Sequence, residues 1–120
     1  MPRDAINTEK MQNQFSRITG YAFVGHTHYP GVIEEGRNFV NPAEMVGGKC
    51  YLLEYETRAI INVGSVGQPR DYDQRACYVT FDGDSVVYRR VEYDAQKACD
   101  LIHNINELDP FLGDRLLEGR

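Results

Sequence analysis

Short apolar runs that end at a glycine or an acidic residue recur along the sequence and restrict it to a strand-rich fold. Runs of this length are typical of buried strands rather than of helices. Between two of them lies Asp82-Gly83, a dipeptide suited to a tight hairpin turn. We expect strands at residues 21–24, 32–33, 50–53, 59–63, 77–81 and 86–91.

Helical spacing of apolar residues occurs at both ends of the chain, and the polar, glycine-containing segment 34–49 predicts mostly loop. The order helix, antiparallel-rich sheet, helix predicts an α+β domain. The first helix is expected to begin near Asn7 or Thr8 and to stop at Gly20, with Met11, Phe15 and Ile18 on one face. The second is capped by Asp94 with a stripe of Ala98, Leu101, Ile102 and Ile105, and the third starts at Asp109-Pro110 and carries Phe111, Leu112 and Leu116.

The composition predicts one globular domain over residues 1–120 and excludes several classes of protein. The net charge is −5 with scattered Lys and Arg, which argues against a duplex nucleic-acid binder. No apolar run approaches the ~20 residues of a membrane span, and the amino terminus has no signal segment. Cys50, Cys77 and Cys99 lack a Cys-x-x-Cys spacing, so we expect reduced thiols and a cytoplasmic protein.

Two histidines, His26 and His28, stand one residue apart directly after the apolar run 21–24. In an extended segment, alternate side chains point to the same side, so both imidazoles can reach one place. Imidazole is the commonest metal ligand near neutral pH, and the pair therefore suggests a metal site. A bare His-x-His is often only a surface feature, so whether a metal is bound stays open at this point.

A second strand end, at residues 60–71, contains candidate anion-binding groups. The backbone of residues 64–67 could present N–H groups to an anion, or it could form only a tight turn. Arg70 could contact a phosphate, although a surface ion pair with Asp71 is an equal alternative. Ser65 and Arg70 are therefore the candidate substrate-binding residues.

Three stretches resemble the carboxy-terminal half of the calcineurin-like metallophosphoesterases, in particular their bacterial phosphodiesterase and serine/threonine-phosphatase-like branches. They are Gly-His-Thr-His-Tyr-Pro-Gly at 25–31, Asn-Val-Gly-Ser-Val-Gly-Gln-Pro-Arg-Asp at 62–71, and Arg-Ala-Cys-Tyr at 75–78 leading into Asp-Gly-Asp at 82–84. The resemblance implies half of an α/β/β/α sandwich, with one mostly antiparallel or mixed sheet and its flanking helices. It also implies hydrolysis of phosphomonoesters or phosphodiesters by a pair of divalent metals, such as Mn, Fe, Ni or Zn.

The ligand pattern of that family is incomplete in this sequence. Intact relatives supply Asp-x-His, Gly-Asp-x-x-Asp, Gly-Asn-His-Asp/Glu, an isolated His and a final Gly-His-x-His, of which only the last is present. By this resemblance His28 would bind the first metal and His26 the second. Two neutral imidazoles without a bridging carboxylate cannot hold two cations, so no catalytic site is complete in this chain. At most one adventitious ion is expected, at these two histidines, because no other side chains have ligand spacing; His103 is expected to be structural.

These features predict a truncated or split metal-dependent phosphoesterase that is inactive as this chain alone. Met1-Pro2-Arg3-Asp4 resembles the stretch that follows the isolated His, as expected for such a truncation. A split enzyme with a separately encoded half and a non-catalytic self-associating or protein-binding module are the alternatives. We expect a dimer or a missing amino-terminal half as partner, because removal of that half would expose strands 21–24, 59–63 and 77–81.

Overall fold

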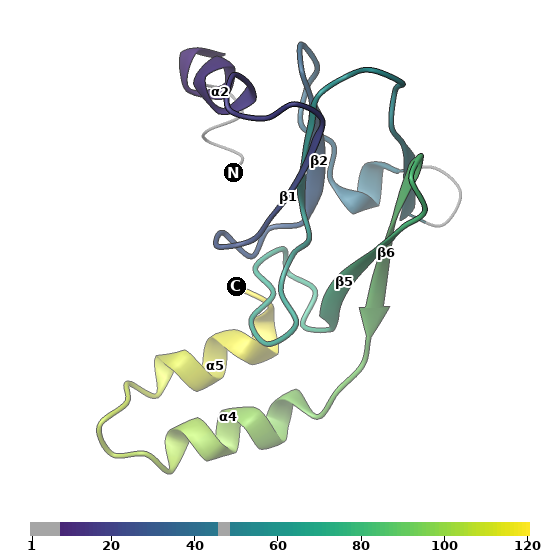
Figure 1. The fold of residues 1–120 in the computed structure, drawn as a ribbon. Helices are drawn as coiled ribbons and strands as arrows, with labels where there is room; N and C mark the ends of the chain where they lie inside the picture. The colour runs from purple at the N-terminus through teal and green to yellow at the C-terminus, as the bar shows by residue number, and fades with distance from the viewer. Residues whose placement is uncertain (1–7, 46–48) are drawn as a thin grey trace.

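The computed structural model describes residues 8–45 and 49–120, and it confirms the expected α+β class (Figure 1). Each expected strand is present, with ends that differ by at most one residue. The Met1–Asp4 stretch lies outside the described residues. The elements are α2 (Thr8–Phe15), β1 (Tyr21–Val24), β2 (Gly31–Glu34), the 3-10 helix η1 (Pro42–Glu44), β3 (Cys50–Leu52), β4 (Ala59–Asn62), β5 (Ala76–Phe81), β6 (Ser85–Val91), α4 (Ala95–His103) and α5 (Phe111–Glu118).

The strands form two three-stranded sheets rather than the single expected sheet. In the first sheet, of order β1-β4-β2, β1 is parallel and β2 antiparallel to the central β4. In the second, of order β3-β6-β5, all pairs are antiparallel. The expectation of one sheet was wrong because β3 and β4, neighbours in sequence, pair with different partners, and the connection between them crosses from one sheet to the other.

The two sheets pack face to face around the main core. This core draws buried side chains from both sheets, and the Tyr88 hydroxyl on β6 donates a hydrogen bond of 2.8 Å to the Asn62 carbonyl on β4. The core residues are Val32, Leu53, Ala59, Ile61, Cys77, Val86 and Tyr88.

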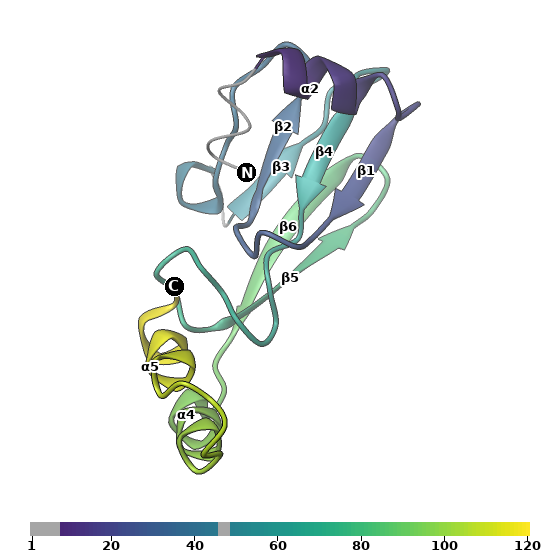
Figure 2. The ribbon, with the colours of Figure 1, turned by 90° about the vertical axis from the view of Figure 1, so that its left-hand side faces the viewer.

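Helix α2 covers the opposite face of the first sheet, which gives the order helix, sheet, sheet (Figure 2). Met11 and Phe15 of α2 pack on Ile33 and Ile60. The helix ends at Phe15 and not at the expected Gly20. Beyond Phe15 the chain turns, and polar side chains there bond back to the last helical turn instead of continuing it.

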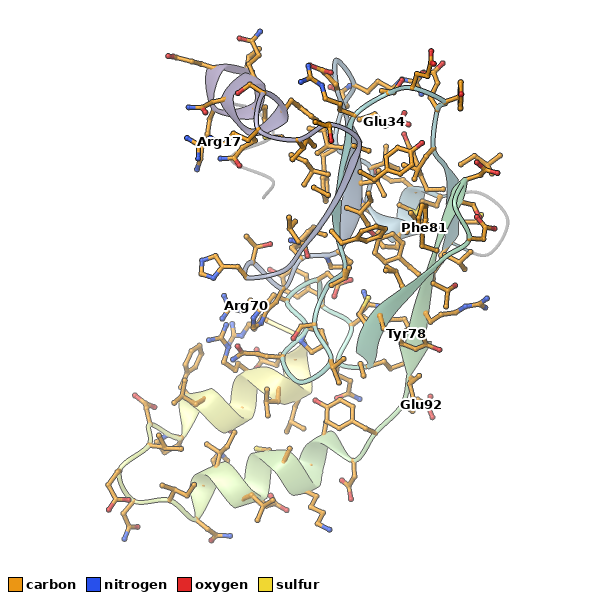
Figure 3. The ribbon with its side chains drawn as sticks, viewed as in Figure 1. Arg17, Glu34, Arg70, Tyr78, Phe81 and Glu92 are labelled. Carbon is orange, nitrogen blue, oxygen red and sulfur yellow. The ribbon has the colours of Figure 1, made fainter. Side chains whose placement is uncertain are left out.

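Aromatic rings close the sandwich along one edge. Phe81, at the end of β5, reaches between the sheets (Figure 3) and makes edge-to-face contacts with Tyr21 and Phe23 of β1, at centroid distances of 5.9 and 5.2 Å. Such contacts add about 0.5–1.5 kcal/mol each beyond the area that they bury. The β1 edge is thereby fixed against the second sheet.

The α4–α5 hairpin extends away from the sheets instead of covering them (Figures 1 and 2). Asp94 caps α4 as expected, by accepting a hydrogen bond of 2.9 Å from the Lys97 amide. The expected apolar stripe of α4 was wrong, because this helix packs on α5 through Ala95 and Cys99 while Leu101 is 60% exposed. The large apolar side chains left exposed on the hairpin are Leu101, Ile105, Leu108, Phe111 and Leu117.

No helix in residues 8–45 and 49–120 is long and apolar enough to cross a membrane.

A cluster of charged side chains joins the start of β5 and the end of β6 to the loop that precedes β5. Arg90 of β6 is nearly fully buried and pairs with Asp71, and its Nη1 donates to the Arg75 carbonyl at 3.2 Å. Arg75 in turn binds Asp73 through two guanidinium nitrogens, at 2.9 and 2.7 Å. These hydrogen bonds, assisted by the positive charge of Arg90, lower the pKa of Asp73 from 3.8 to about 2.

We predict that Asp73→Asn makes the protein less stable at neutral pH and less sensitive to acid. A carboxylate whose pKa is lowered in the folded state stabilises it fully above the unfolded value of 3.8 and progressively less as the pH falls toward about 2. Because Asp73 is partly exposed to solvent, we expect a loss of only about 1 kcal/mol in the free energy of unfolding. Urea denaturation followed by circular dichroism, in a pH series, measures this difference.

The control for this prediction is Asp84→Asn, the same chemical change at an exposed carboxylate in the β5–β6 turn. This variant should unfold like the parent protein throughout the series. Equal stability of the Asp73→Asn variant and the parent at neutral pH would contradict the role given to the Asp73–Arg75 pair.

Candidate metal centre

The parallel pairing of β1 and β4 brings the two functional loops together. Val24 and Asn62, the last residues of these strands, are partners in the register. The chain leaves both strands at the same edge of the sheet, so the histidine loop (residues 25–30) and the glycine loop (residues 63–70) lie side by side (Figure 2). The amide of Arg70 confirms this contact by donating a hydrogen bond of 3.2 Å to the His28 carbonyl.

Asn62 is a fully buried side chain that holds both loops. Its Nδ2 donates to the Gly25 carbonyl at 3.2 Å and to the Thr27 hydroxyl at 2.9 Å, and its Oδ1 accepts from the Gly64 amide at 3.0 Å. Both ends of the amide are therefore satisfied without water. Sequence reasoning placed Asn62 in a strand but gave it no role. The sequence feature that could have indicated this role is a polar amide side chain at the end of the apolar run Ala59–Asn62.

His28 is held by one ring nitrogen and leaves the other free. Its Nδ1 lies 2.9 Å from the Gln68 carbonyl oxygen. A carbonyl can only accept, so Nδ1 carries a proton, and in the neutral ring Nε2 then has the lone pair. Metal-binding histidines commonly have this arrangement, because the hydrogen bond fixes the ring and its tautomer. The ring of His28 is thus fixed in one orientation by the glycine loop.

His26 is exposed, and within the described residues it makes no hydrogen bond or ion pair. The expectation that these residues continue as an extended segment, in which alternation would direct both imidazoles to one side, was wrong. Strand β1 ends at Val24, and His26 and His28 have left-handed backbone angles, with φ of 70° and 60°. Their directions follow from turn geometry held by Asn62 rather than from a strand.

Ser65 occupies a tight turn, one of the two alternatives that the sequence left open. Its hydroxyl oxygen accepts from the Gln68 amide at 3.0 Å, and its carbonyl accepts from the Cys77 amide at 2.8 Å. Gly64, with φ of +80°, lies so close to β5 that a Cβ atom there would be 2.8 Å from the Cys77 sulfur. The glycine is therefore required by the close approach of the loop to β5.

Arg70 is not paired with Asp71, which binds Arg90 instead. Its Nη2 donates to the Gln68 side chain at 3.0 Å, while its Nε is buried and has no hydrogen-bond partner in the described part of the chain. The Arg70 side chain lies near the histidine and glycine loops, on the side of the molecule above the α4–α5 hairpin (Figure 3). An arginine without a carboxylate partner is suited to bind a phosphate or another oxyanion.

A pair of divalent metals does not fit the residues of this site alone. In residues 8–45 and 49–120, His26 and His28 belong to no group of three or more histidine, cysteine or carboxylate ligand atoms that could share an ion. The one such group is elsewhere, at Cys99, His103 and Asp114. The expectation that no other side chains have ligand spacing was therefore wrong, because it overlooked a helical i, i+4 pair and a residue returned by the hairpin.

We predict that Asn62→Leu, which keeps the size of the side chain, destabilises the protein by at least about 2 kcal/mol. The substitution leaves the Gly25 carbonyl and the Gly64 amide without their buried partner, and each such group costs about 1–3 kcal/mol. His28 should also lose its single tautomer. Urea denaturation measures the first effect, and nitrogen-detected NMR of the imidazoles measures the second.

Asn38→Leu, at an exposed position, is the control and should change neither quantity. An Asn62→Leu variant that keeps both its stability and a His28 ring protonated only at Nδ1 would show that Asn62 does not hold the loops.

Comparison with known proteins relates the chain to larger ones. No protein-family model matches it. An uncharacterised protein of Methanocaldococcus jannaschii is 44% identical over 100 residues, which are 82% of this chain and 39% of that protein. The crystal structure of a metallophosphoesterase from Sphaerobacter thermophilus superposes with a TM-score of 0.78 at 32% identity, over 98% of this chain and 47% of the other. The chain spans less than half the length of either relative.

Proposed function

We propose that this chain, which has the calcineurin-like fold of metallophosphoesterases over about half the length of such an enzyme, is the carboxy-terminal part of a metal-dependent phosphoesterase. Its reaction would be the hydrolysis of phosphomonoester or phosphodiester bonds. The missing ligands would come from a second polypeptide segment, and the chain alone would be inactive.

The observation that carries this proposal is the orientation of His28. Its ring is fixed by the hydrogen bond between Nδ1 and the Gln68 carbonyl, and its loop is tied by Asn62 to the neighbouring glycine loop. In the neutral ring Nε2 has a lone pair that can bind a metal. When bound, the metals of such an enzyme neutralise phosphoryl charge and activate water. The contribution of this chain is to supply imidazole ligands.

Arg70 and Ser65 would donate hydrogen bonds to a phosphate bound beside these ligands. The Arg70 amide donates a hydrogen bond to the His28 carbonyl, so the backbone of Arg70 lies against the histidine loop. It has no acidic partner among the described residues and can bind phosphoryl oxygens by two parallel hydrogen bonds. The Ser65 hydroxyl accepts from Gln68 and still has its own proton to donate.

The edge of β1 is the surface where we place the second segment. β1 is an edge strand, and a neighbouring apolar groove between it and α2 is lined by Met11, Ile18, Ala22 and Ile60, among others. A strand added at this edge would extend the sheet, and a loop from its end would reach the histidine loop. This arrangement explains how an absent segment could complete the set of ligands.

Self-association is the second candidate, and the α4–α5 hairpin favours it. The earlier reason for expecting a dimer was wrong for strand β4, which is buried on both faces. Exposed apolar side chains do remain on β1 and β5, at Phe23, Tyr78 and Phe81, and further ones lie on the hairpin; exposed apolar patches are typical of protein–protein contacts. A dimer through the hairpin leaves the β1 edge free for the second segment, so the two candidates are compatible.

We predict that the purified chain does not hydrolyse bis-p-nitrophenyl phosphate with manganese, nickel or iron, because no carboxylate bridges the metals. Co-expression with the amino-terminal half of the Methanocaldococcus jannaschii relative should restore turnover, and His26→Ala/His28→Ala should abolish that restored activity. Turnover by the chain alone, above that of this double variant, would refute the claim of inactivity. Failure of the two halves to produce activity as a stable complex would refute the proposed function.

We predict that the chain is a dimer at micromolar concentration, joined through the hairpin. Multi-angle light scattering should give twice the monomer mass for the parent protein and the monomer mass for Leu101→Glu/Phe111→Glu, because charges on the patch oppose its burial. Leu52→Glu, at an exposed leucine on β3, is the matched control and should stay dimeric. A monomeric parent protein would exclude self-association as a function.

A further inference from the structure

Gln68, in the glycine loop, makes separate hydrogen bonds with its backbone amide, its backbone carbonyl and its side chain. The amide donates to the Ser65 hydroxyl oxygen at 3.0 Å, and the carbonyl oxygen lies 2.9 Å from Nδ1 of His28. The side-chain Oε1 accepts from Nη2 of Arg70 at 3.0 Å. The imidazole that would bind a metal and the guanidinium that would bind a phosphate are therefore both bonded to the same residue.

The sequence on the carboxyl side of Gln68 restricts its conformation. Pro69 follows it and is fully buried. A proline has a nearly fixed φ and confines the residue before it to extended conformations, in which alternate side chains point to the same side. The contact between the side chains of Gln68 and Arg70 agrees with this restriction. A segment held in this way loses little conformational freedom when it binds a ligand.

The partner of the Arg70 guanidinium is a neutral group. The adjacent carboxylate, Asp71, pairs with Arg90, and no carboxylate pairs with Arg70 in residues 8–45 and 49–120. An amide oxygen can fix the position of a guanidinium without neutralising its charge, whereas a carboxylate would form an ion pair with it. The positive charge of Arg70 thus stays available to an anion.

The hydrogen-bonding groups that remain at these side chains are mainly donors. The oxygens of Ser65 and Gln68 already accept hydrogen bonds within the loop. The Ser65 hydroxyl proton and the Gln68 Nε2 group make no hydrogen bond in the described part of the chain, and the buried Nε of Arg70 has no partner there. Phosphoryl oxygens only accept hydrogen bonds, so this set of groups suits an oxyanion better than a cation.

We propose that Gln68 is a positioning residue, which holds the Arg70 guanidinium for the phosphoryl group of the substrate through a neutral hydrogen bond. This inference rests on the proposed function, because the phosphoryl group belongs to the phosphoester that the site would hydrolyse. Gln68 acts through Arg70, and its own Nε2 is a further donor to the same group.

A purely structural tie within the loop is the simpler interpretation of the hydrogen bond between Gln68 and Arg70. The two interpretations differ for Gln68→Glu. A carboxylate binds a guanidinium at least as strongly as an amide does, so a structural tie would be kept or strengthened. The charge available to an anion would be lost in the same variant, so stability and anion binding should respond differently.

The test measures binding of inorganic phosphate to the full chain without metal, by ³¹P NMR titration in the presence of EDTA. The parent protein should bind phosphate saturably. Gln68→Glu should weaken this binding roughly 10–100-fold, as expected for loss of a charge-assisted hydrogen bond, while its resistance to urea stays equal or rises. Gln68→Met, which has no amide oxygen to hold Arg70, should weaken phosphate binding roughly 2–10-fold.

Gln12→Glu, the same chemical change at an exposed position of α2, is the control for net charge and should bind phosphate like the parent protein. Absence of saturable phosphate binding by the parent would overturn the proposal, as would unchanged affinity in Gln68→Glu. If Gln68→Glu did not fold, Gln68→Met would decide, and parental affinity in that variant would exclude a positioning role. Inactivity of the complex of the two halves would refute the proposed function alone, because phosphate binding is measured on this chain without metal.

Discussion

The buried amide of Asn62 is the interaction on which the rest of the structure depends. Its side chain joins the histidine loop to the glycine loop, and its carbonyl accepts the Tyr88 hydroxyl from the opposite sheet. One residue thus connects both sheets with both loops. Because a buried amide stabilises only when all its partners are in place, the packing of the two sheets and the shape of the loops depend on each other.

Features that depend on residues close in sequence could be predicted. The strand positions, the turn at Asp82-Gly83 and the cap at Asp94 follow from apolar runs and from side chains that bond the nearby backbone. The division into two sheets could not be predicted, since it depends on which distant strands pair. For the same reason the buried face of α4 was misjudged: its partner is α5 and not a sheet.

In the candidate site, too, the residue types could be predicted from the sequence but their arrangement could not. The residue types at His26 and His28 were informative, but their orientation depends on left-handed turns and on Asn62, which strand alternation does not describe. That Asp71 binds Arg90 and leaves Arg70 unpaired depends on the end of β6, which is distant in sequence. The cluster around His103 requires the return of α5 to α4, a contact that no local pattern predicts.

The left-handed backbone at His26 and His28 has a consequence for how this chain responds to selection. A side chain in that conformation costs roughly 1–2 kcal/mol that glycine avoids. Glycine in place of His26, which makes no hydrogen bond in the described part of the chain, would therefore remove this cost, whereas glycine in place of His28 would also lose the hydrogen bond to Gln68. Stability and ligand supply oppose each other in this loop. Directed evolution of the chain for heat resistance alone would favour loss of the His26 imidazole, on which the proposed function depends.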